Sequence, residues 1–359
     1  MKNPKQKNRR RHAHTTLSAL FLAIAALSGC GDSTVVATSV GLVTDTGGIS
    51  DRSFNATAWK GVQDAQRQLG IAGAYLESQQ ASDYALNIQN FADKNYELIV
   101  TVGFPQAEAT QAAAAAYPGR KFAIVDAAYS PALPNVMGLT FKSDEAAFLA
   151  GYLAAGMSQT AKVGTFGGTA IPPVTIFMVG FEKGVQHYNQ VKGKKVEVIG
   201  WKTDASAAAC GTGRFTGTFV NLEKGRLFAN QLMDEGADIV LPLAGTAGLG
   251  AAAAIQERAK VMIGVDSDQY IASPDYQEIY LTSILKNSDQ AIFDVIQTVE
   301  EKTFQGGTYL GSLKNKGVGL APYHALDTKV PAWLKSEIEQ LKQDTIRGTV
   351  DTGWGACAS

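Results

Sequence analysis

The stretch that decides the fold is VVATSVGLVT, residues 35–44, together with the helical segment that follows it from about Ser53 to Leu69. An apolar, β-branched run of this length is typical of a buried strand. A helix directly after such a run is typical of one unit of a parallel sheet. The segment DTGGISDRSFN, residues 45–55, joins the strand to the helix and is rich in glycine and polar side chains. This first unit predicts an α/β fold.

The same strand-and-helix unit recurs along the chain. We expect further strands at residues 72–77, 98–102, 122–126, 136–141, 162–166, 196–201, 238–243, 261–265 and 279–285. We expect further helices from residue 83, after residue 105, and at 144–157, 176–189, 222–235, 249–259, 288–303 and 333–343, with the helix at 144–157 amphipathic. This alternation predicts doubly wound parallel sheets with helices on both faces. The chain is longer than one core usually supports, so we expect two lobes.

The N-terminus has the order of a secretory signal peptide. Six Lys and Arg residues and no acid precede an apolar run from Leu17 to Leu27, which is too short to span a bilayer. The run ends in LSGC, residues 27–30, which resembles a bacterial lipobox. That resemblance implies cleavage after residue 29 and lipidation of Cys30, whose acyl chains would hold the protein at the extracytoplasmic membrane surface. The alternative is ordinary cleavage at another small residue, with Cys30 incidental.

Charge and motif content exclude several classes of protein. The chain has a net charge of −1, and removing the six positive charges of the signal segment leaves −7. There is no basic run and no interleaving of basic and aromatic residues, so we expect no nucleic-acid partner. Metal-ligand spacing, Walker-type loops and nucleophile-elbow motifs are absent from the sequence as well. We therefore expect no metal and no cofactor.

Cysteine usage fits export. After Cys30 only Cys210 and Cys357 remain, and in an oxidising compartment such a pair favours a disulfide over two free thiols. A catalytic thiol would need a histidine partner. Only His187 and His324 follow the signal segment, and neither lies near a motif.

Polar residues stand at the ends of several expected strands. Four of them are Asp45, Asp126, Asp266 and Lys286, and a further strand ends at the turn that contains Gly245, which offers backbone amides. Ligands of doubly wound folds bind beyond the carboxyl ends of the strands, so these residues are candidates for one binding cleft. A lone Asp after a strand can instead be a helix N-cap, and Ser53 is expected to cap the helix that follows the first loop.

Several blocks, in order, resemble the bacterial basic membrane protein family of lipoproteins. They are DTGGISDRSFN at 45–55, FLAGYLAA at 148–155, GTFGG at 164–168 with IPP at 171–173, GFEKG at 180–184, AGTAG at 244–248, IGVDSDQ at 263–269, and LTS at 281–283 with Lys286. The resemblance implies a type I periplasmic-binding fold, capture of a purine nucleoside and delivery to an ABC importer.

The resemblance also implies roles for residues near the start of the chain. Asp45 matches a carboxylate that hydrogen-bonds the base, and Phe54 matches an aromatic side chain that stacks on it. Asn55 matches a polar partner in the same motif. Asp126 matches a second carboxylate that lines the cleft.

Roles for the second half follow in the same way. Asp266 matches the acid that binds the ribose hydroxyls, Lys286 the base at the crossover between lobes, and Gly245 a backbone contact. The chain departs from the family pattern where relatives commonly carry an aromatic residue, because it has LPL at 241–243. Phe177 is a candidate for the second face of the base, with a core position as the alternative. The stretch 205–218 is a local variation.

The domain organisation implied is a signal peptide at 1–29, an N-terminal lobe of 30–140 plus 287–318, and a C-terminal lobe of 141–286 plus 319–359. We expect a monomer that binds a small molecule and an ABC permease and is not an enzyme. The alternatives are a ligand-sensing lipoprotein for a sugar or flavin, and a nucleoside-cleaving enzyme.

Overall fold

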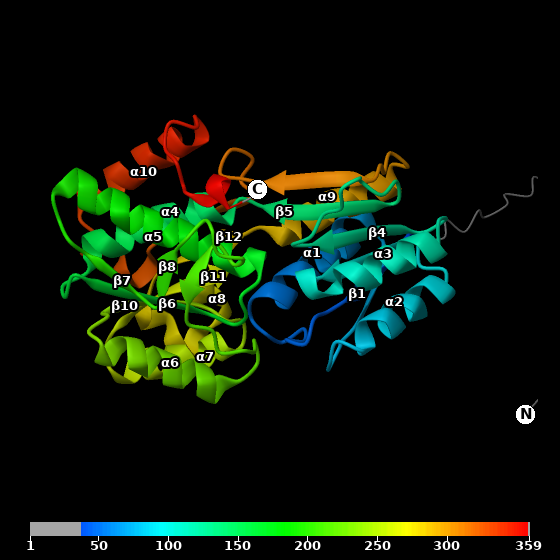
Figure 1. Cartoon of the computed structure of the whole chain (residues 1–359). Helices are drawn as coiled ribbons and strands as arrows, with labels where there is room; N and C mark the ends of the chain where they lie inside the picture. The colour runs from blue at the N-terminus through cyan, green and yellow to red at the C-terminus, as the bar shows by residue number, and fades with distance from the viewer. Residues whose placement is uncertain (1–36, 358–359) are drawn as a thin grey trace, which may run out of the picture. The chain divides into compact units, whose positions relative to one another are not determined.

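The computed structural model describes residues 37–357, which form two mostly parallel sheets with helices on both faces (Figure 1). The signal segment and Cys30 lie outside the described residues. The first sheet has the order β13-β5-β4-β3-β1-β2. Its strands are β1 (Ser39–Val43), β2 (Ala72–Leu76), β3 (Leu98–Val102), β4 (Lys121–Val125), β5 (Val136–Phe141) and β13 (Gly307–Gly311). The α/β prediction is confirmed.

The second sheet has the order β14-β12-β11-β10-β6-β7. Its strands are β6 (Lys162–Gly167), β7 (Glu197–Ile199), β10 (Ile239–Leu243), β11 (Val261–Asp266), β12 (Tyr280–Lys286) and β14 (Val318–Leu320). All pairs within it are parallel except β14, which runs antiparallel to β12 at the edge. A separate two-stranded sheet joins β8 (Trp201–Thr203) to β9 (Gly211–Gly213).

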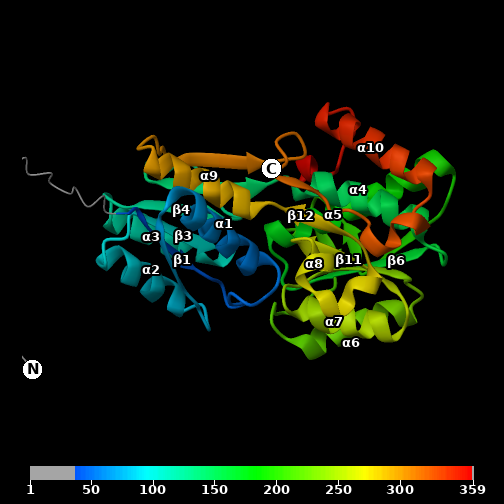
Figure 2. The same cartoon turned by 180° about the vertical axis from the view of Figure 1, so that it is seen from behind.

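Each sheet is covered by helices on both faces (Figures 1 and 2). On the first sheet, α1 (Phe54–Leu69) packs with α9 (Ser288–Glu300), and α2 (Asp83–Asp93) packs with α3 (Ala107–Ala116). On the second, α4 (Ser143–Met157) packs with α5 (Pro172–Lys192), and α6 (Leu222–Asp234) packs with α7 (Ala247–Glu257). The short helix α8 (Gln269–Ala272) follows β11, and α10 (Ala332–Ile346) packs on α4.

Strand alternation explains the two layers of core. In β1, Val40 and Leu42 pack with α1 and α9, whereas Val43 packs in the cluster that contains Ile88 and Phe91 of α2. Successive side chains of a strand point to opposite faces, so a strand that is buried on both faces is apolar throughout. We call each sheet with its helices a lobe. The chain passes from the first lobe to the second after β5, returns after β12, and passes again after β13.

The helix predicted at 144–157 is present as α4, but the prediction that it is amphipathic is wrong. Every residue from Ser143 to Ala155 in α4 is buried, so this helix has no solvent face along that length. The cause is the close crossing of α4 and α5. A Cβ atom added at Gly151 would lie 2.0 Å from the carbonyl oxygen of Phe181, so glycine permits the two backbones to touch.

The strand predicted at 196–201 is also wrong in part. The chain turns at Gly200, whose φ is +91°, and the strand divides there into β7 and β8. Only β7 joins the second sheet, because β8 pairs with β9. Near β9 a disulfide joins Cys210 to Cys357, whose Cα atoms are 5.5 Å apart.

Candidate ligand-binding site

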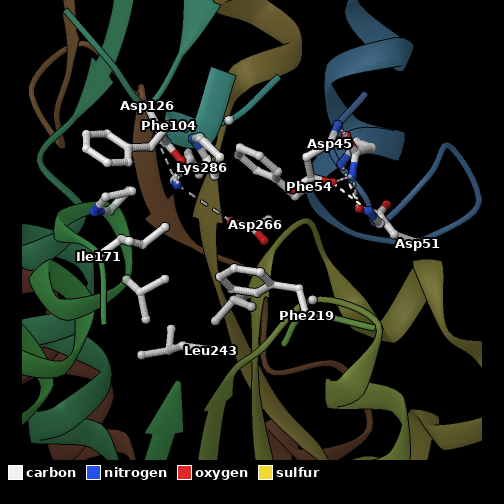
Figure 3. Close-up of a pocket in the computed structure, with 18 of the residues that line it drawn as sticks. Asp45, Asp51, Phe54, Phe104, Asp126, Ile171, Phe219, Leu243, Asp266 and Lys286 are labelled. Atoms are coloured by element: carbon white, nitrogen blue, oxygen red, sulfur yellow. Dashed lines mark hydrogen bonds and ion pairs between the residues drawn. The ribbon is translucent and has the colours of Figure 1, made fainter. Parts of the chain in front are cut away.

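A cavity lies between the two sheets, at the carboxyl ends of their strands (Figure 3). All eight residues proposed from the sequence line it: Asp45, Phe54, Asn55, Asp126, Phe177, Gly245, Asp266 and Lys286. The structure therefore brings together residues that are up to 241 positions apart in the chain. Their roles as ligand contacts stay predictions.

Asp45 is held by the loop that follows β1. Its Oδ1 atom accepts hydrogen bonds from Asn55 Nδ2 at 2.7 Å and from the backbone N–H of Gly47 at 2.8 Å. Asn55 Oδ1 in turn accepts a hydrogen bond from the Asp45 backbone N–H. Burial raises the pKa of Asp45 to about 6, against the opposing effect of these hydrogen bonds, and the charges of Asp51 and Asp266 add to the rise. At neutral pH the side chain is an ionised acceptor at the cavity wall.

Asp51, and not Ser53, caps α1. Its two oxygens accept from the backbone N–H groups of Ser53, Asn55 and Ala56 at 2.7–3.0 Å. The expectation of a Ser53 cap is wrong, because the Ser53 hydroxyl points to the other lobe. It lies 2.9 Å from Asp266 Oδ2, at the end of β11. This contact connects the first loop of one lobe to a strand end of the other.

A buried ion pair lies between the lobes. Lys286 Nζ is 2.8 and 3.0 Å from the two carboxylate oxygens of Asp126, and 3.9 Å from Asp266 Oδ1. The side chains of Lys286 and Asp126 are 4% and 7% exposed, so water screens the pair weakly. Burial raises the pKa of Asp126, and the ammonium group of Lys286 opposes that rise. The ammonium also lies 5.1 Å from the ring centroids of both Phe54 and Phe177.

Two of these carboxylates have left-handed backbone. Asp126 and Asp266 each have φ of +67°, a conformation that costs energy for residues other than glycine and that is tolerated best by Asp and Asn. Each follows a parallel strand of its own sheet. Such strain concentrates at functional sites, where the surrounding structure holds it in place.

Aromatic rings form the remaining walls, and sequence reasoning missed two of them. Phe104 follows β3, and Phe219 lies in the loop before α6. Phe54 and Phe219 enter the cavity from different lobes (Figure 3). Phe177 is only 3% exposed and belongs to the core, and it also lines the cavity. The core position and the position in the cavity wall, given above as alternatives, are therefore both found.

Glycines make room for Phe219. A Cβ atom at Gly168 would lie 2.3 Å from the Phe219 ring, and one at Gly245 would lie 3.1 Å from its carbonyl oxygen. Gly245 also has φ of +53°, which favours glycine. The signal that could have found Phe219 is the TGT segment at 216–218, which precedes the aromatic residue and then a helix.

The cavity carries an excess of acid over base. Four carboxylates line it, from Asp45, Asp51, Asp126 and Asp266, against the single ammonium of Lys286. Such a site favours neutral or cationic ligands that donate hydrogen bonds. Within residues 37–357, no group of three or more His, Cys, Asp or Glu side chains is placed to hold a metal ion. His187 and His324 lie away from the cavity lining, and His324 pairs with Asp268 at 2.7 Å.

Over the same described residues, no helix combines the length and the apolar character needed to cross a membrane.

Comparison with known proteins shows the family. A family model described as ABC transporter substrate-binding protein, PnrA-like, matches residues 38–210 and 212–349. An ABC transporter nucleoside-binding protein of Lactococcus lactis is 32% identical, over 93% of this chain and 97% of that protein. An uncharacterized lipoprotein of Pyrococcus horikoshii is 31% identical, over 85% of this chain and 74% of that protein.

A solved structure agrees. The chain is similar to an ABC transporter solute-binding protein of Aeropyrum pernix, with a TM-score of 0.77 and 28% identity over 87% of this chain and 92% of that one. The fold is of the type I periplasmic-binding-protein-like class, and the resemblance found in the sequence blocks is confirmed. The chain belongs to the basic membrane protein family, the PnrA-like substrate-binding proteins of ABC transporters.

Proposed function

We propose that this protein is a lipid-anchored receptor that captures a purine nucleoside between its two lobes and delivers it to the permease of an ABC importer. The observation that carries the proposal is the combination of Phe54 and Phe219, entering from different lobes, with carboxylates around the same cavity. A purine offers a flat ring for stacking and N–H donors, and a ribose offers a diol. The name of the Lactococcus lactis relative supports this ligand class.

The first lobe supplies the contacts to the base. Two donors already occupy Asp45 Oδ1, so the carboxylate would receive N–H groups of the base chiefly at Oδ2. Asn55 orients that carboxylate through its own amide. Stacking on Phe54 and Phe219 contributes about 1–3 kcal/mol per ring contact.

The second lobe supplies the contacts to the sugar. Asp266 accepts two hydroxyl donors of the ribose, and the nearby ammonium of Lys286 limits the repulsion between Asp266 and Asp126. The backbone at Gly245 completes this side. A phosphate on the sugar would meet four carboxylates and a lysine that is already paired, so the site selects nucleosides over nucleotides.

Ligand binding stabilises the closed arrangement of the lobes. Ser53 bonds Asp266 across the cleft, and the carbonyl oxygen of Arg52 accepts from Gln269 Nε2 at 2.9 Å and Ser267 Oγ at 3.2 Å. These direct contacts hold the lobes together, and a ligand that touches both lobes adds to them. Contacts that exist only in the closed form shift the population toward it. The permease then recognises the closed form.

The anchor and the domain limits belong to the same proposal. Cleavage after residue 29 leaves Cys30 as the acylated first residue. The lobes comprise residues 30–140 plus 287–318 and residues 141–286 plus 319–359. The protein acts as a monomer and releases its ligand chemically unchanged.

Mass spectrometry of small molecules released on denaturation, followed by calorimetric titration with nucleosides, tests the proposal. We expect a purine nucleoside to be released and to bind again, and we expect the F54A and D266A variants to lose binding. F228A is a matched control, because Phe228 is an aromatic residue of α6 outside the cavity. Uptake of a sugar or a flavin and of no nucleoside would refute the ligand class. Conversion of the nucleoside to free base during the titration would refute the binding-protein function.

A further inference from the structure

A second cavity, of about 480 Å³, adjoins the first. We call it the back chamber. The two cavities share Phe104, Asp126, Pro173 and Lys286. The ammonium of Lys286 lies 5.1 Å from the Phe54 ring, which lines the first cavity, and 5.9 Å from the Phe141 ring, which lines the back chamber. The Lys286–Asp126 ion pair is therefore part of the partition between them.

Part of the partition faces solvent, and a ligand can pass there without breaking the ion pair. Phe104 is 38% exposed and lines both cavities, as does the half-buried Pro173. Rotation of an exposed phenyl ring costs little compared with separation of a buried ion pair. A substituent on a ligand in the first cavity can thus reach the back chamber beside Phe104.

The C-terminal tail supplies one wall of the back chamber. Trp354 lines it and lies in a 3-10 turn, η4 (Trp354–Ala356), that packs on α5. Two constraints hold this tail: the disulfide between Cys357 and Cys210, and a hydrogen bond from Thr352 to Asp144. Neither six-stranded sheet contains the tail, so these two constraints place Trp354 at the chamber wall.

The lining of the back chamber specifies the chemistry of its occupant. Four aromatic residues contribute to the walls: Phe104, Tyr129, Phe141 and Trp354. The acids are Glu108 and Asp126, and the cation in the lining, Lys286, is already paired. Aromatic walls favour a ring, and the excess of carboxylate disfavours an anion.

We propose that the back chamber is a second subsite that takes an uncharged, ring-bearing substituent of a nucleoside held in the first cavity. The proposal rests on the proposed function, and it extends the ligand class from plain nucleosides to nucleosides modified on the base or at the 5′ carbon. Trp354 is then a specificity-determining residue for modified ligands and has no role with the unmodified ones.

A reporter thiol in the back chamber tests the proposal. Ala128 is exposed and lines that chamber but not the first cavity, and Ala116 is an exposed residue at the end of α3 outside both. The A128C and A116C variants of the mature protein are alkylated in the presence of adenosine, of adenosine benzylated on its exocyclic amine, or of adenosine benzylated at the 5′ oxygen. Calorimetry gives the affinity of each ligand in parallel.

We expect at least one benzylated ligand to slow alkylation of the A128C thiol about tenfold or more, with adenosine changing it less than about twofold and A116C unaffected. We also expect A128W, which fills the chamber, and W354A, which removes a wall, to weaken that benzylated ligand about tenfold while adenosine binds as before.

Three results would overturn the subsite. They are loss of binding on benzylation at both positions, equal protection of the thiol by adenosine and the benzylated ligand, and indifference of the benzylated ligand to A128W. Failure of every purine nucleoside to bind is a different result, because it refutes the proposed function and the subsite falls with it.

Discussion

Asp45 makes the ligand-free protein less stable at neutral pH than it would be with a neutral side chain at that position. Burial raises the pKa of Asp45 from its ordinary value of 3.8 to about 6. At pH values between these two pKa values, Asp45 is protonated in the folded chain and ionised in the unfolded chain. Stability is therefore lost as pH rises through this window, and the full loss is present above about pH 6.

The D45N variant removes the loss and keeps the local geometry. An asparagine Oδ1 can accept the same two hydrogen bonds, from Asn55 and Gly47, that Asp45 Oδ1 accepts. If protonated aspartate and asparagine are equivalent in the fold, D45N gains about 3 kcal/mol in free energy of unfolding at pH 7.5 and about 1 kcal/mol at pH 4.5. The same variant should bind nucleosides more weakly, because it lacks the charged acceptor.

Urea unfolding of the ligand-free wild type and of D45N at both pH values measures the difference in their free energies of unfolding. D204N is the control, because hydrogen bonds from Ser206 lower the pKa of the exposed Asp204. Its sign is opposite: stability conferred by ionised Asp204 is present above the ordinary pKa and lost as pH falls. D204N should therefore have a lower free energy of unfolding than wild type at pH 7.5, and this difference should be smaller at pH 4.5. A gap for D45N that is independent of pH, or a D45N variant less stable than wild type at pH 7.5, would refute the reasoning.

Three further changes follow from the same site. K286M should lower the free energy of unfolding by about 3–5 kcal/mol, because it leaves the carboxylate of Asp126 buried without its partner. A loss below about 1 kcal/mol in urea unfolding would contradict the buried pair. K260M, at a position away from the cavity, is the control. F219A should weaken adenosine binding by about 1–3 kcal/mol in calorimetry, whereas unchanged affinity would remove Phe219 from the stacking wall. S53A should shift the ligand-free protein toward an open form with a larger radius of gyration in solution scattering, because it removes a hydrogen bond of about 1.5–3 kcal/mol to Asp266 across the cleft. S336A is its control, because the Ser336 hydroxyl donates within α10 to the carbonyl oxygen of Ala332. Equal scattering curves for S53A and wild type would exclude Ser53 as a contact that favours closure.

The sequence determined the strands and helices that depend only on the properties of neighbouring residues. The runs LIVTV at 98–102 and VMGLTF at 136–141 became strands with the predicted limits, because they are buried and apolar enough to have no alternative as loops. Helix α1 and the polar strand ends at Asp45, Asp126 and Asp266 were also predicted, since residue order alone places a polar side chain where a parallel strand stops.

Tertiary structure decided features that depend on the partner segment. The residue pattern of α4 gave no sign of a helix buried on all sides, because its burial depends on packing against α5, the next helix, and α10, which lies far along the chain. The edge strands β13 and β14 are ordered by pairing with β5 and β12 and carry weak patterns of their own.

The site divides in the same way. The sequence by itself determined which residue types stand at the strand ends, since strand length and loop position are properties of neighbouring residues. Only the tertiary structure decided that Ser53 bonds Asp266 and leaves the cap of α1 to Asp51, and that Phe219 enters the cavity where Gly168 and Gly245 leave space. The first choice depends on side chains that meet across the two lobes from positions 213 apart in the chain, and the second on the packing of three loops within the second lobe.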